Sequence, residues 1–144
     1  MITGVHHTGV IVSSIEKVLP FYRDTLGMKV TAKLGVQDGP EVPIIMGIPN
    51  AKVDIVMLQI GGQTFELIQL VNPVGKAIPS ETPFGQVGHG HIAYQVDNIR
   101  DAYRTLKQKG VKVVLPPQEI PGVMEFFYVR DPDGLWVELV HPLE

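Results

Sequence analysis

Apolar positions along the chain follow two periods, one typical of strands and one typical of helices. Residues 5–12 form a mostly apolar run that predicts a strand. The next apolar positions recur at helical spacing and form one stripe: Ile15, Val18, Leu19, Tyr22 and Leu26. Ser13 or Ser14 can cap this helix. Pro20 removes a backbone donor and predicts a kink or a split, and Gly27 ends the helix.

Three further strands are predicted in the first half of the chain, at residues 28–34, 53–60 and 63–70. The last two flank Gly61-Gly62, which is a signal for a short hairpin turn. Residues 36–50 are rich in glycine and proline, and we expect only turns there.

The same order of elements restarts after a connection rich in proline and glycine, which we place at 73–87. A strand is predicted at 89–96, and a helical stripe from Ile99 to Leu106 is closed by Gly110. Three strands complete the second half, at residues 111–115, 125–129 and 135–140. Asp131-Pro132-Asp133-Gly134 forms the turn before the last strand.

This restart is an internal repeat of a strand–helix–strand–strand–strand module. His7 and His91 stand in the first strand of each half, at nearly the same distance before the glycine that ends the helix. The last strand of each half follows the pattern Gly-x-x-x-Glu-Leu, which places Glu66 and Glu138 at equivalent positions. Each half therefore carries one His and one Glu at matching places.

Side-chain alternation along the strands predicts that these four residues lie on the sheet face away from the helices. Alternate residues of a strand point to the same side, so the large apolar side chains of each half form a face that packs on the helix. His7, Glu66, His91 and Glu138 fall on the opposite face. A single strand His is more often packed or exposed, and a single Glu is usually solvated. The equivalence of four such residues favours a metal site.

Two imidazoles and two carboxylates suit a divalent metal of intermediate character, and we expect one Ni, Co, Mn, Zn or Fe ion. Burial of two carboxylates without a cation would be costly, which supports the same interpretation. Four protein ligands in an octahedron leave two positions for adjacent oxygens of a small-molecule substrate.

Composition excludes several other classes of function. The 144 residues include five histidines and no cysteine, so disulfides, thiolate metal sites and a cysteine nucleophile are excluded. The net charge is −3 and no basic stripe is present, which argues against nucleic acid as a partner. No apolar run approaches a membrane span, and the N-terminus lacks the pattern of a signal peptide. We expect a cytoplasmic protein that binds neither nucleic acid nor membrane.

Four segments of the chain resemble the vicinal oxygen chelate superfamily, which includes glyoxalase I, methylmalonyl-CoA epimerase, extradiol dioxygenases and bleomycin resistance proteins. They are Val5-His6-His7-Thr8-Gly9-Val10, Phe21-Tyr22-Arg23-Asp24-Thr25-Leu26-Gly27-Met28, Gly90-His91-Ile92-Ala93, and Asp131-Pro132-Asp133-Gly134 with Glu138-Leu139. The resemblance covers nearly the whole chain.

The resemblance implies an α+β fold in which two βαβββ modules form a cupped eight-stranded mixed sheet with helices on its outer face. We expect one domain over 1–144, with module one at about 1–72 and module two at about 88–144. The resemblance also implies that His7, Glu66, His91 and Glu138 are the metal ligands, in agreement with the strand alternation.

The filled ligand set resembles that of glyoxalase I and, with Gln in place of one Glu, methylmalonyl-CoA epimerase. It implies a lyase or isomerase that moves a proton next to a carbonyl through a metal-bound enediolate. The resemblance to glyoxalases nominates Glu66 or Glu138 as the base, whereas the resemblance to epimerases nominates Asp54, unless Asp54 merely faces water.

Two other functions stay open on the sequence. One is an Fe(II) dioxygenase of the extradiol type, although a fourth ligand at Glu66 would crowd that chemistry. The other is a non-catalytic resistance protein of the same fold that binds a small molecule. Such a binding protein has no need of two inward carboxylates. An open sheet edge leads us to expect a homodimer, since twofold dimers are the commonest oligomers.

Overall fold

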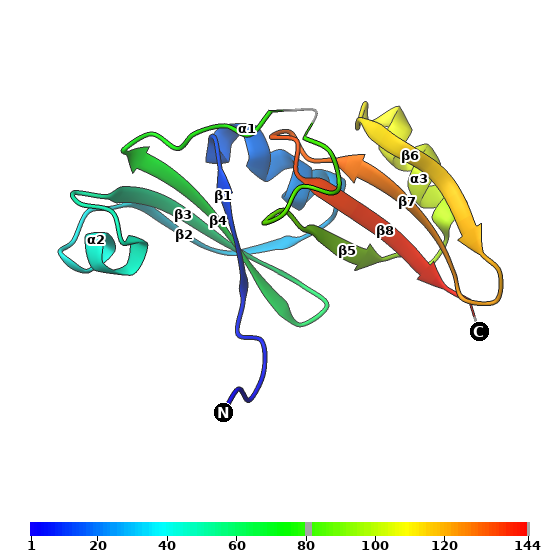
Figure 1. Ribbon diagram of the computed structural model, residues 1–144, viewed down its shortest axis with the longest axis horizontal. Coiled ribbons are helices and arrows are strands. Elements are labelled where there is room, and N and C mark those ends of the chain that lie inside the picture. Colours follow the sequence, from blue (N-terminus) through cyan, green and yellow to red (C-terminus); the bar gives the residue numbers. More distant parts are fainter. Residues whose placement is uncertain (80–81, 144) are drawn as a thin grey trace. The chain divides into compact units, whose positions relative to one another are not determined.

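The computed structural model describes residues 1–79 and 82–143. The chain divides into two compact units, Met1–Ala77 and Ile78–Glu144, each with its own four-stranded mixed sheet. Figure 1 shows that the two units repeat one order of elements, a strand, a helix and three further strands, with one extra short helix in the first unit. The expected α+β fold of two βαβββ modules is confirmed, and hydrogen bonding groups the eight strands in two sheets of four.

The first sheet has the order β1-β4-β3-β2, with β1 parallel to β4 and the other pairs antiparallel. Its strands are β1 (Thr8–Val12), β2 (Lys29–Gln37), β3 (Lys52–Ile60) and β4 (Gln63–Asn72). The β3–β4 turn is made by Gly61 and Gly62, both with positive φ, as the hairpin signal predicts. Strand β1 begins three residues later than the apolar run suggested.

One face of this sheet is covered by the helix that follows β1. The side chain of Ser14 accepts a hydrogen bond from the Lys17 backbone N–H and caps α1 (Ile15–Pro20). Pro20 ends the α-helical part, and the chain continues as one π-helical turn, η1 (Phe21–Thr25), which confirms the predicted break. Tyr22 is fully buried, and its ring lies 4.9 Å from that of Phe65. The apolar face of the sheet is therefore the helix-covered one.

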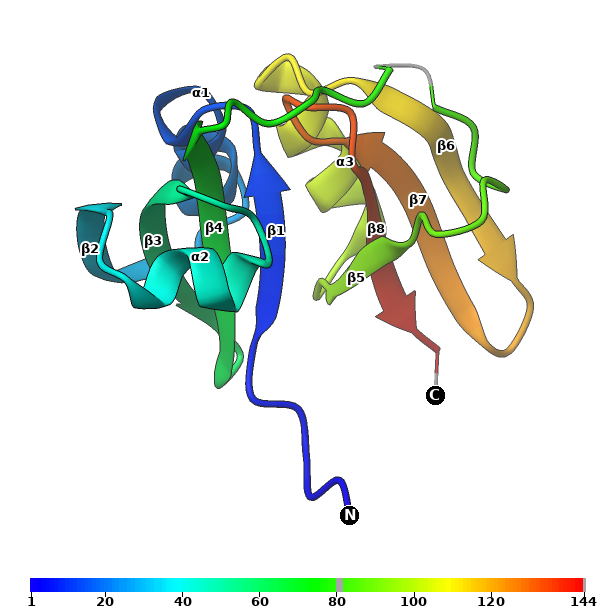
Figure 2. The ribbon, with the colours of Figure 1, turned by 60° about the vertical axis from the view of Figure 1, so that its left-hand side comes forward.

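A second, short helix covers part of the opposite face. Helix α2 (Glu41–Met46) begins after Pro40 and ends at Gly47, whose φ is positive. Its residue Val42 packs with Ala51 and Val53, and partly buried apolar residues of β3 and β4 surround them. Figure 2 shows α2 lying across this sheet. The sequence predicted only turns here, because a helix of six residues between prolines and glycines has no room for a visible helical period.

The second sheet has the order β5-β8-β7-β6 and repeats the pattern of parallel and antiparallel pairs. Its strands are β5 (His91–Gln95), β6 (Val113–Ile120), β7 (Met124–Arg130) and β8 (Trp136–Pro142). Strand β6 continues beyond the predicted end at 115, with a break in its register before Gln118. Between 72 and 91, no helix or strand occurs in the described residues, as expected for a connection.

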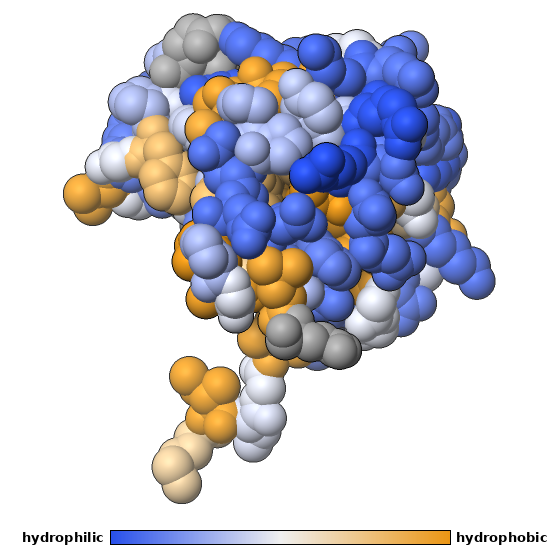
Figure 3. Space-filling view, turned by 90° about the vertical axis from the view of Figure 1, so that its right-hand side faces the viewer, coloured by the Kyte–Doolittle hydropathy of each residue, from blue (hydrophilic) through white to orange (hydrophobic). Residues whose placement is uncertain are grey.

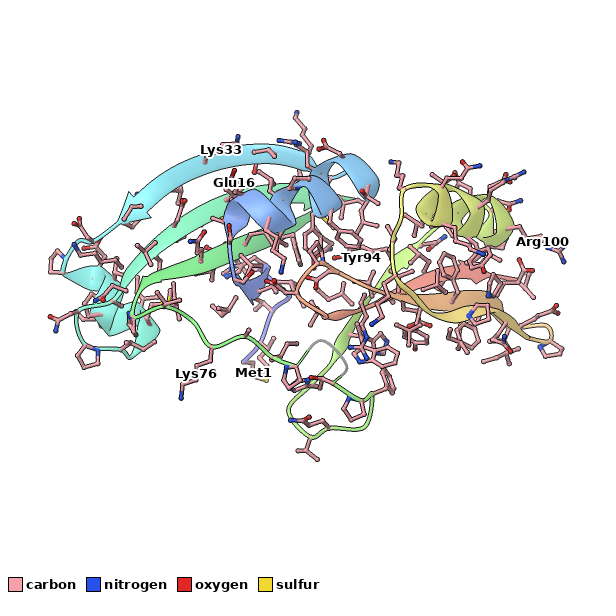
Figure 4. The ribbon with its side chains drawn as sticks, turned by 90° about the horizontal axis from the view of Figure 1, so that it is seen from above. Met1, Glu16, Lys33, Lys76, Tyr94 and Arg100 are labelled. Carbon is pink, nitrogen blue, oxygen red and sulfur yellow. The ribbon has the colours of Figure 1, made fainter. Side chains whose placement is uncertain are left out.

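Helix α3 (Ile99–Gln108) covers the apolar face of the second sheet. The Asn98 side chain caps it by accepting a hydrogen bond from the Asp101 backbone N–H. Ile99 and Phe127 are almost completely buried, whereas Arg100 points away from the sheet in Figure 4. Figure 3 shows a largely hydrophilic surface on the side of α3 and β6. In the part of the chain that the structure describes, no helix has the length and apolar character of a membrane span.

Candidate metal centre

Strand register in the first unit places one imidazole beside one carboxylate. Gly9 of β1 pairs with Glu66 of β4, so His7, two positions before Gly9, lies on the same face as Glu66. His7 Nε2 lies 3.5 Å from Glu66 Oε2. The buried residues Phe65 and Leu67 point to the opposite, helix-covered face. The face assignment made from strand alternation is correct for this half.

Gly9 leaves the space that the Glu66 carboxylate uses. A Cβ atom built on Gly9 would lie 3.4 Å from Glu66 Oε2 and 3.6 Å from Cδ1 of Ile68. A methyl group would fit there, but a branched side chain would meet the carboxylate. A small residue at position 9 is therefore required for the observed position of Glu66.

His6 is a contact of His7 that the sequence did not indicate. The Nδ1 atoms of the two rings are 2.7 Å apart, and the rings meet edge to face with centroids 5.0 Å apart. One of the two nitrogens must donate a proton to the other. This bond holds the His7 ring and leaves Nε2 on the side of Glu66. Such bonds from the second ring nitrogen orient metal-binding histidines.

The second unit repeats the pair in a more enclosed setting. Ala93 of β5 pairs with Glu138 of β8, and His91 shares their face. His91 Nε2 lies 2.9 Å from Glu138 Oε2. The Glu138 side chain is 9% exposed, compared with 17% for Glu66. The second carboxylate is thus nearer to its imidazole and more deeply buried than the first.

Tyr128 accounts for part of this difference. It lies opposite Glu138 in the β7–β8 pairing, whereas Met57 occupies the corresponding place opposite Glu66. Burial raises the pKa of the Tyr128 hydroxyl, and the negative charge of Glu138 and a hydrogen bond between the two side chains raise it further. The protonated hydroxyl donates to the carboxylate and holds Glu138 in place. Met57 offers Glu66 no such bond.

The donor atoms of each pair have a spacing that one divalent ion can use. Two ligands about 2.1 Å from an ion and at right angles to each other lie about 3 Å apart. The two measured spacings, 2.9 and 3.5 Å, are close to this value. Among residues 1–79 and 82–143, no three His, Asp or Glu side chains gather into one cluster. The candidate ligands are therefore two pairs, one in each unit, with the nitrogen and oxygen chemistry that such an ion prefers.

Asp54 does not join this group. In the β3–β4 pairing Met57 lies opposite Glu66, so the odd-numbered residues of β3 share the face of Glu66. Asp54 has the other parity and lies on the face of Val56 and Leu58, which the helix covers. Asp54 therefore lies on the face opposite to the His7–Glu66 pair.

Comparison with known proteins finds relatives that match nearly the whole chain. Residues 4–139 match the Glyoxalase/Bleomycin resistance protein/Dioxygenase superfamily. The chain is 30% identical to a probable lactoylglutathione lyase of Synechocystis sp., over 93% of this chain and 92% of that protein. It is 29% identical to mitochondrial methylmalonyl-CoA epimerase of Mus musculus, over 94% of this chain and 71% of that protein. A crystal structure of a glyoxalase family protein from Bacillus cereus superposes with a TM-score of 0.89 at 18% identity, covering 100% of this chain and 97% of that one.

Proposed function

Because the chain belongs to the Glyoxalase/Bleomycin resistance protein/Dioxygenase superfamily, we propose that it is a divalent-metal-dependent lyase or isomerase that moves a proton next to a carbonyl group. The observation that carries this proposal is the His–Glu pair in each unit, with donor spacings of 2.9 and 3.5 Å. Relatives named as lactoylglutathione lyase and methylmalonyl-CoA epimerase support the same type of reaction.

His7, Glu66, His91 and Glu138 would hold the ion. A divalent cation supplies Lewis acidity toward two adjacent oxygens of a substrate and stabilises the negative charge that develops when a proton leaves the neighbouring carbon. The imidazoles serve as neutral donors, and the carboxylates balance the charge of the ion. Four such donors retain the ion and leave room for the substrate.

A carboxylate near the substrate must also accept and return the proton. Glu66 and Glu138 are the two candidates for this step. Glu66 is 3.5 Å from its imidazole and lies opposite Met57, which offers the carboxylate no hydrogen bond. Glu138 is held by His91 at 2.9 Å and by the Tyr128 hydroxyl. The replacements Glu66→Gln and Glu138→Gln keep the shape of each side chain and separate the two roles by their effects on kcat and on metal content.

Metal analysis of the purified protein tests the proposal first. Ni, Co, Mn or Zn at stoichiometric level, with turnover of the methylglyoxal–glutathione adduct or of methylmalonyl-CoA, would support it. Oxygen-sensitive Fe(II) with cleavage of a catechol would replace it by the dioxygenase function. If no metal binds even after reconstitution, the enzymatic proposal fails.

Mixing two variants shows whether the two His–Glu pairs that hold one ion come from the same chain or from two chains. His7→Ala and His91→Ala each disable one pair, so neither variant alone should bind the metal with normal affinity. If one ion is shared between units of two chains, a mixed dimer regains one intact site and part of the activity. If both pairs come from one chain, mixing restores nothing. Val87→Ala, at a side chain that is 98% exposed, serves as the control for expression and folding.

A further inference from the structure

Two aromatic rings, those of Phe84 and Tyr128, contact the His91 ring in the second unit, and the Trp136 ring contacts both of them. The Phe84 ring lies 5.3 Å from the His91 ring, 5.5 Å from Tyr128 and 5.0 Å from Trp136, measured between centroids. Tyr128 lies 5.5 Å from His91 and 5.6 Å from Trp136. Phe84 belongs to the connection and the other rings to the sheet, so the connection brings an aromatic side chain onto the proposed metal ligand.

Thr82 fixes the connection in this position. Its backbone carbonyl accepts a hydrogen bond from the Trp136 indole N–H at 3.1 Å and another from Arg130 Nη2 at 2.8 Å. The Arg130 guanidinium also lies over the Trp136 ring, 4.6 Å from its centroid. Thr82 is 2% exposed. In Figure 2 the chain that leads into β5 passes beside β7 and β8. Phe84, two residues after this buried anchor, is thereby held against Trp136.

A pocket of about 280 Å³ opens between these groups. It is lined by Phe84, Trp136, His91, His89, Gln86 and two glycines. A dry apolar cavity of about 150 Å³ is enough for benzene, so this pocket has room for a six-membered ring and the atoms that link it to another group. None of these described lining residues is Lys or Arg, so the pocket offers a phosphate or carboxylate no permanently positive side chain. None is Asp or Glu either.

Phe84 keeps a large part of its apolar surface in contact with water. It is 50% exposed although it belongs to an aromatic cluster. A ligand ring beside Phe84 and Trp136 would remove this apolar surface from water, and aromatic pairs gain further from offset or edge-to-face contact. Saturated groups gain the burial but not the ring contact.

We propose that this pocket binds an aromatic ring joined to the two-oxygen group of the substrate, with Phe84 and Trp136 as specificity-determining residues. This inference rests on the proposed function, because His91 both lines the pocket and is a proposed metal ligand. The substrate class is then an aryl compound that carries a carbonyl oxygen and an adjacent second oxygen, the two oxygens directed to the metal and the ring to Phe84.

Unreactive hydroxamates test this assignment, because each presents two adjacent oxygens with a different attached group. Benzohydroxamate, cyclohexanecarbohydroxamate and acetohydroxamate are titrated into the metal-loaded protein. Trp136 is the sole tryptophan of the chain, so its fluorescence reports binding at the pocket, and calorimetry gives an independent dissociation constant. We expect benzohydroxamate to bind about tenfold more tightly than acetohydroxamate, with the cyclohexyl compound between them.

Phe84→Ala should remove most of the preference for benzohydroxamate over acetohydroxamate. Elemental analysis checks the metal content of this variant, and circular dichroism checks its fold. Phe84→Leu should equalise the phenyl and cyclohexyl compounds. Val87→Ala, a replacement in the same connection at a side chain that is 98% exposed, is the matched control and should keep the preference.

Equal affinity for all three hydroxamates, or an unchanged preference in Phe84→Ala, would overturn the pocket assignment and leave the proposed function standing. Failure of every hydroxamate to bind, together with full metal retention by His91→Ala, would overturn both.

Discussion

Replacement of Gly9 by valine is predicted to lower the metal affinity without lowering the free energy of unfolding. Gly9 lies in β1 directly beside Glu66, and its φ is not in the left-handed region, so a side chain there does not strain the backbone. Glycine within a strand costs roughly 0.5–1 kcal/mol relative to alanine. Valine has a high strand propensity, so we expect Gly9→Val to keep or slightly raise the free energy of unfolding.

The effect on the carboxylate follows from one distance. A Cβ on Gly9 would lie 3.4 Å from Glu66 Oε2. A carbon–carbon bond adds about 1.5 Å, so a γ-methyl directed at Oε2 would approach to about 2 Å, far inside contact distance. Glu66 must move away. Disturbance of groups that position metal ligands typically costs 10- to 100-fold in affinity, or about 1.4–2.8 kcal/mol, and we expect a loss in this range.

Calorimetric titration with Ni²⁺ or Zn²⁺ measures the affinity, and urea denaturation measures the free energy of unfolding. Gly9→Ala is the matched control, because a methyl group alone keeps ordinary contact with Glu66 and should leave the affinity nearly unchanged. Undiminished metal affinity in Gly9→Val would refute the placement of Glu66 in the metal site. A parallel loss of stability and affinity would show that the fold, and not the carboxylate, had been disturbed.

Three further predictions concern the second unit. His91→Ala and Glu138→Ala should each abolish stoichiometric metal binding in elemental analysis; retention by both would remove them from the ligand set. Arg130→Met should lower the free energy of unfolding by about 3 kcal/mol in urea denaturation, since two backbone carbonyls lose charged donors, and an unchanged midpoint would contradict this. Among the described residues the buried Tyr94 hydroxyl, labelled in Figure 4, has no hydrogen-bond partner, so Tyr94→Phe should raise stability by about 1 kcal/mol at pH 7. Burial, and then the charge of Asp131, raises the Tyr94 pKa above its ordinary value near 10. The unfolded chain therefore loses this proton first, stability falls as the pH rises above 10, and Tyr94→Phe should reduce that fall.

Much of the fold could be predicted because its determinants are local and occur twice. Pro20 split the first helix where expected, and Gly61-Gly62 closed the expected hairpin. Helix α2 could not be predicted from periodicity. Its position depends on the contact of Val42 with Ala51 and Val53, which come after the end of the helix in the sequence.

The candidate site was predictable within each half for the same reason. Strand alternation depends only on sequence spacing, and the β1–β4 and β5–β8 registers agree with it for His7 with Glu66 and for His91 with Glu138. The same rule, applied to Asp54 through the β3–β4 hairpin, would have placed it on the other face.

Contacts from neighbouring segments lay beyond sequence reasoning. Phe84 approaches His91 only because Thr82, two residues earlier, is bound by two side chains that follow it by about 50 positions. No local pattern marks such a long-range anchor. An aromatic residue in a connection rich in glycine and proline is the one signal that could have drawn attention to it.

The two carboxylates of the repeat, Glu66 and Glu138, have different neighbours. The two halves repeat one order of strands, and the residues paired with each carboxylate differ between them. Here Glu66 has glycine and methionine as neighbours, whereas Glu138 has alanine and a tyrosine hydroxyl. Substitutions at Gly9 or Met57 therefore change the surroundings of the first carboxylate, whereas substitutions at Ala93 or Tyr128 change those of the second.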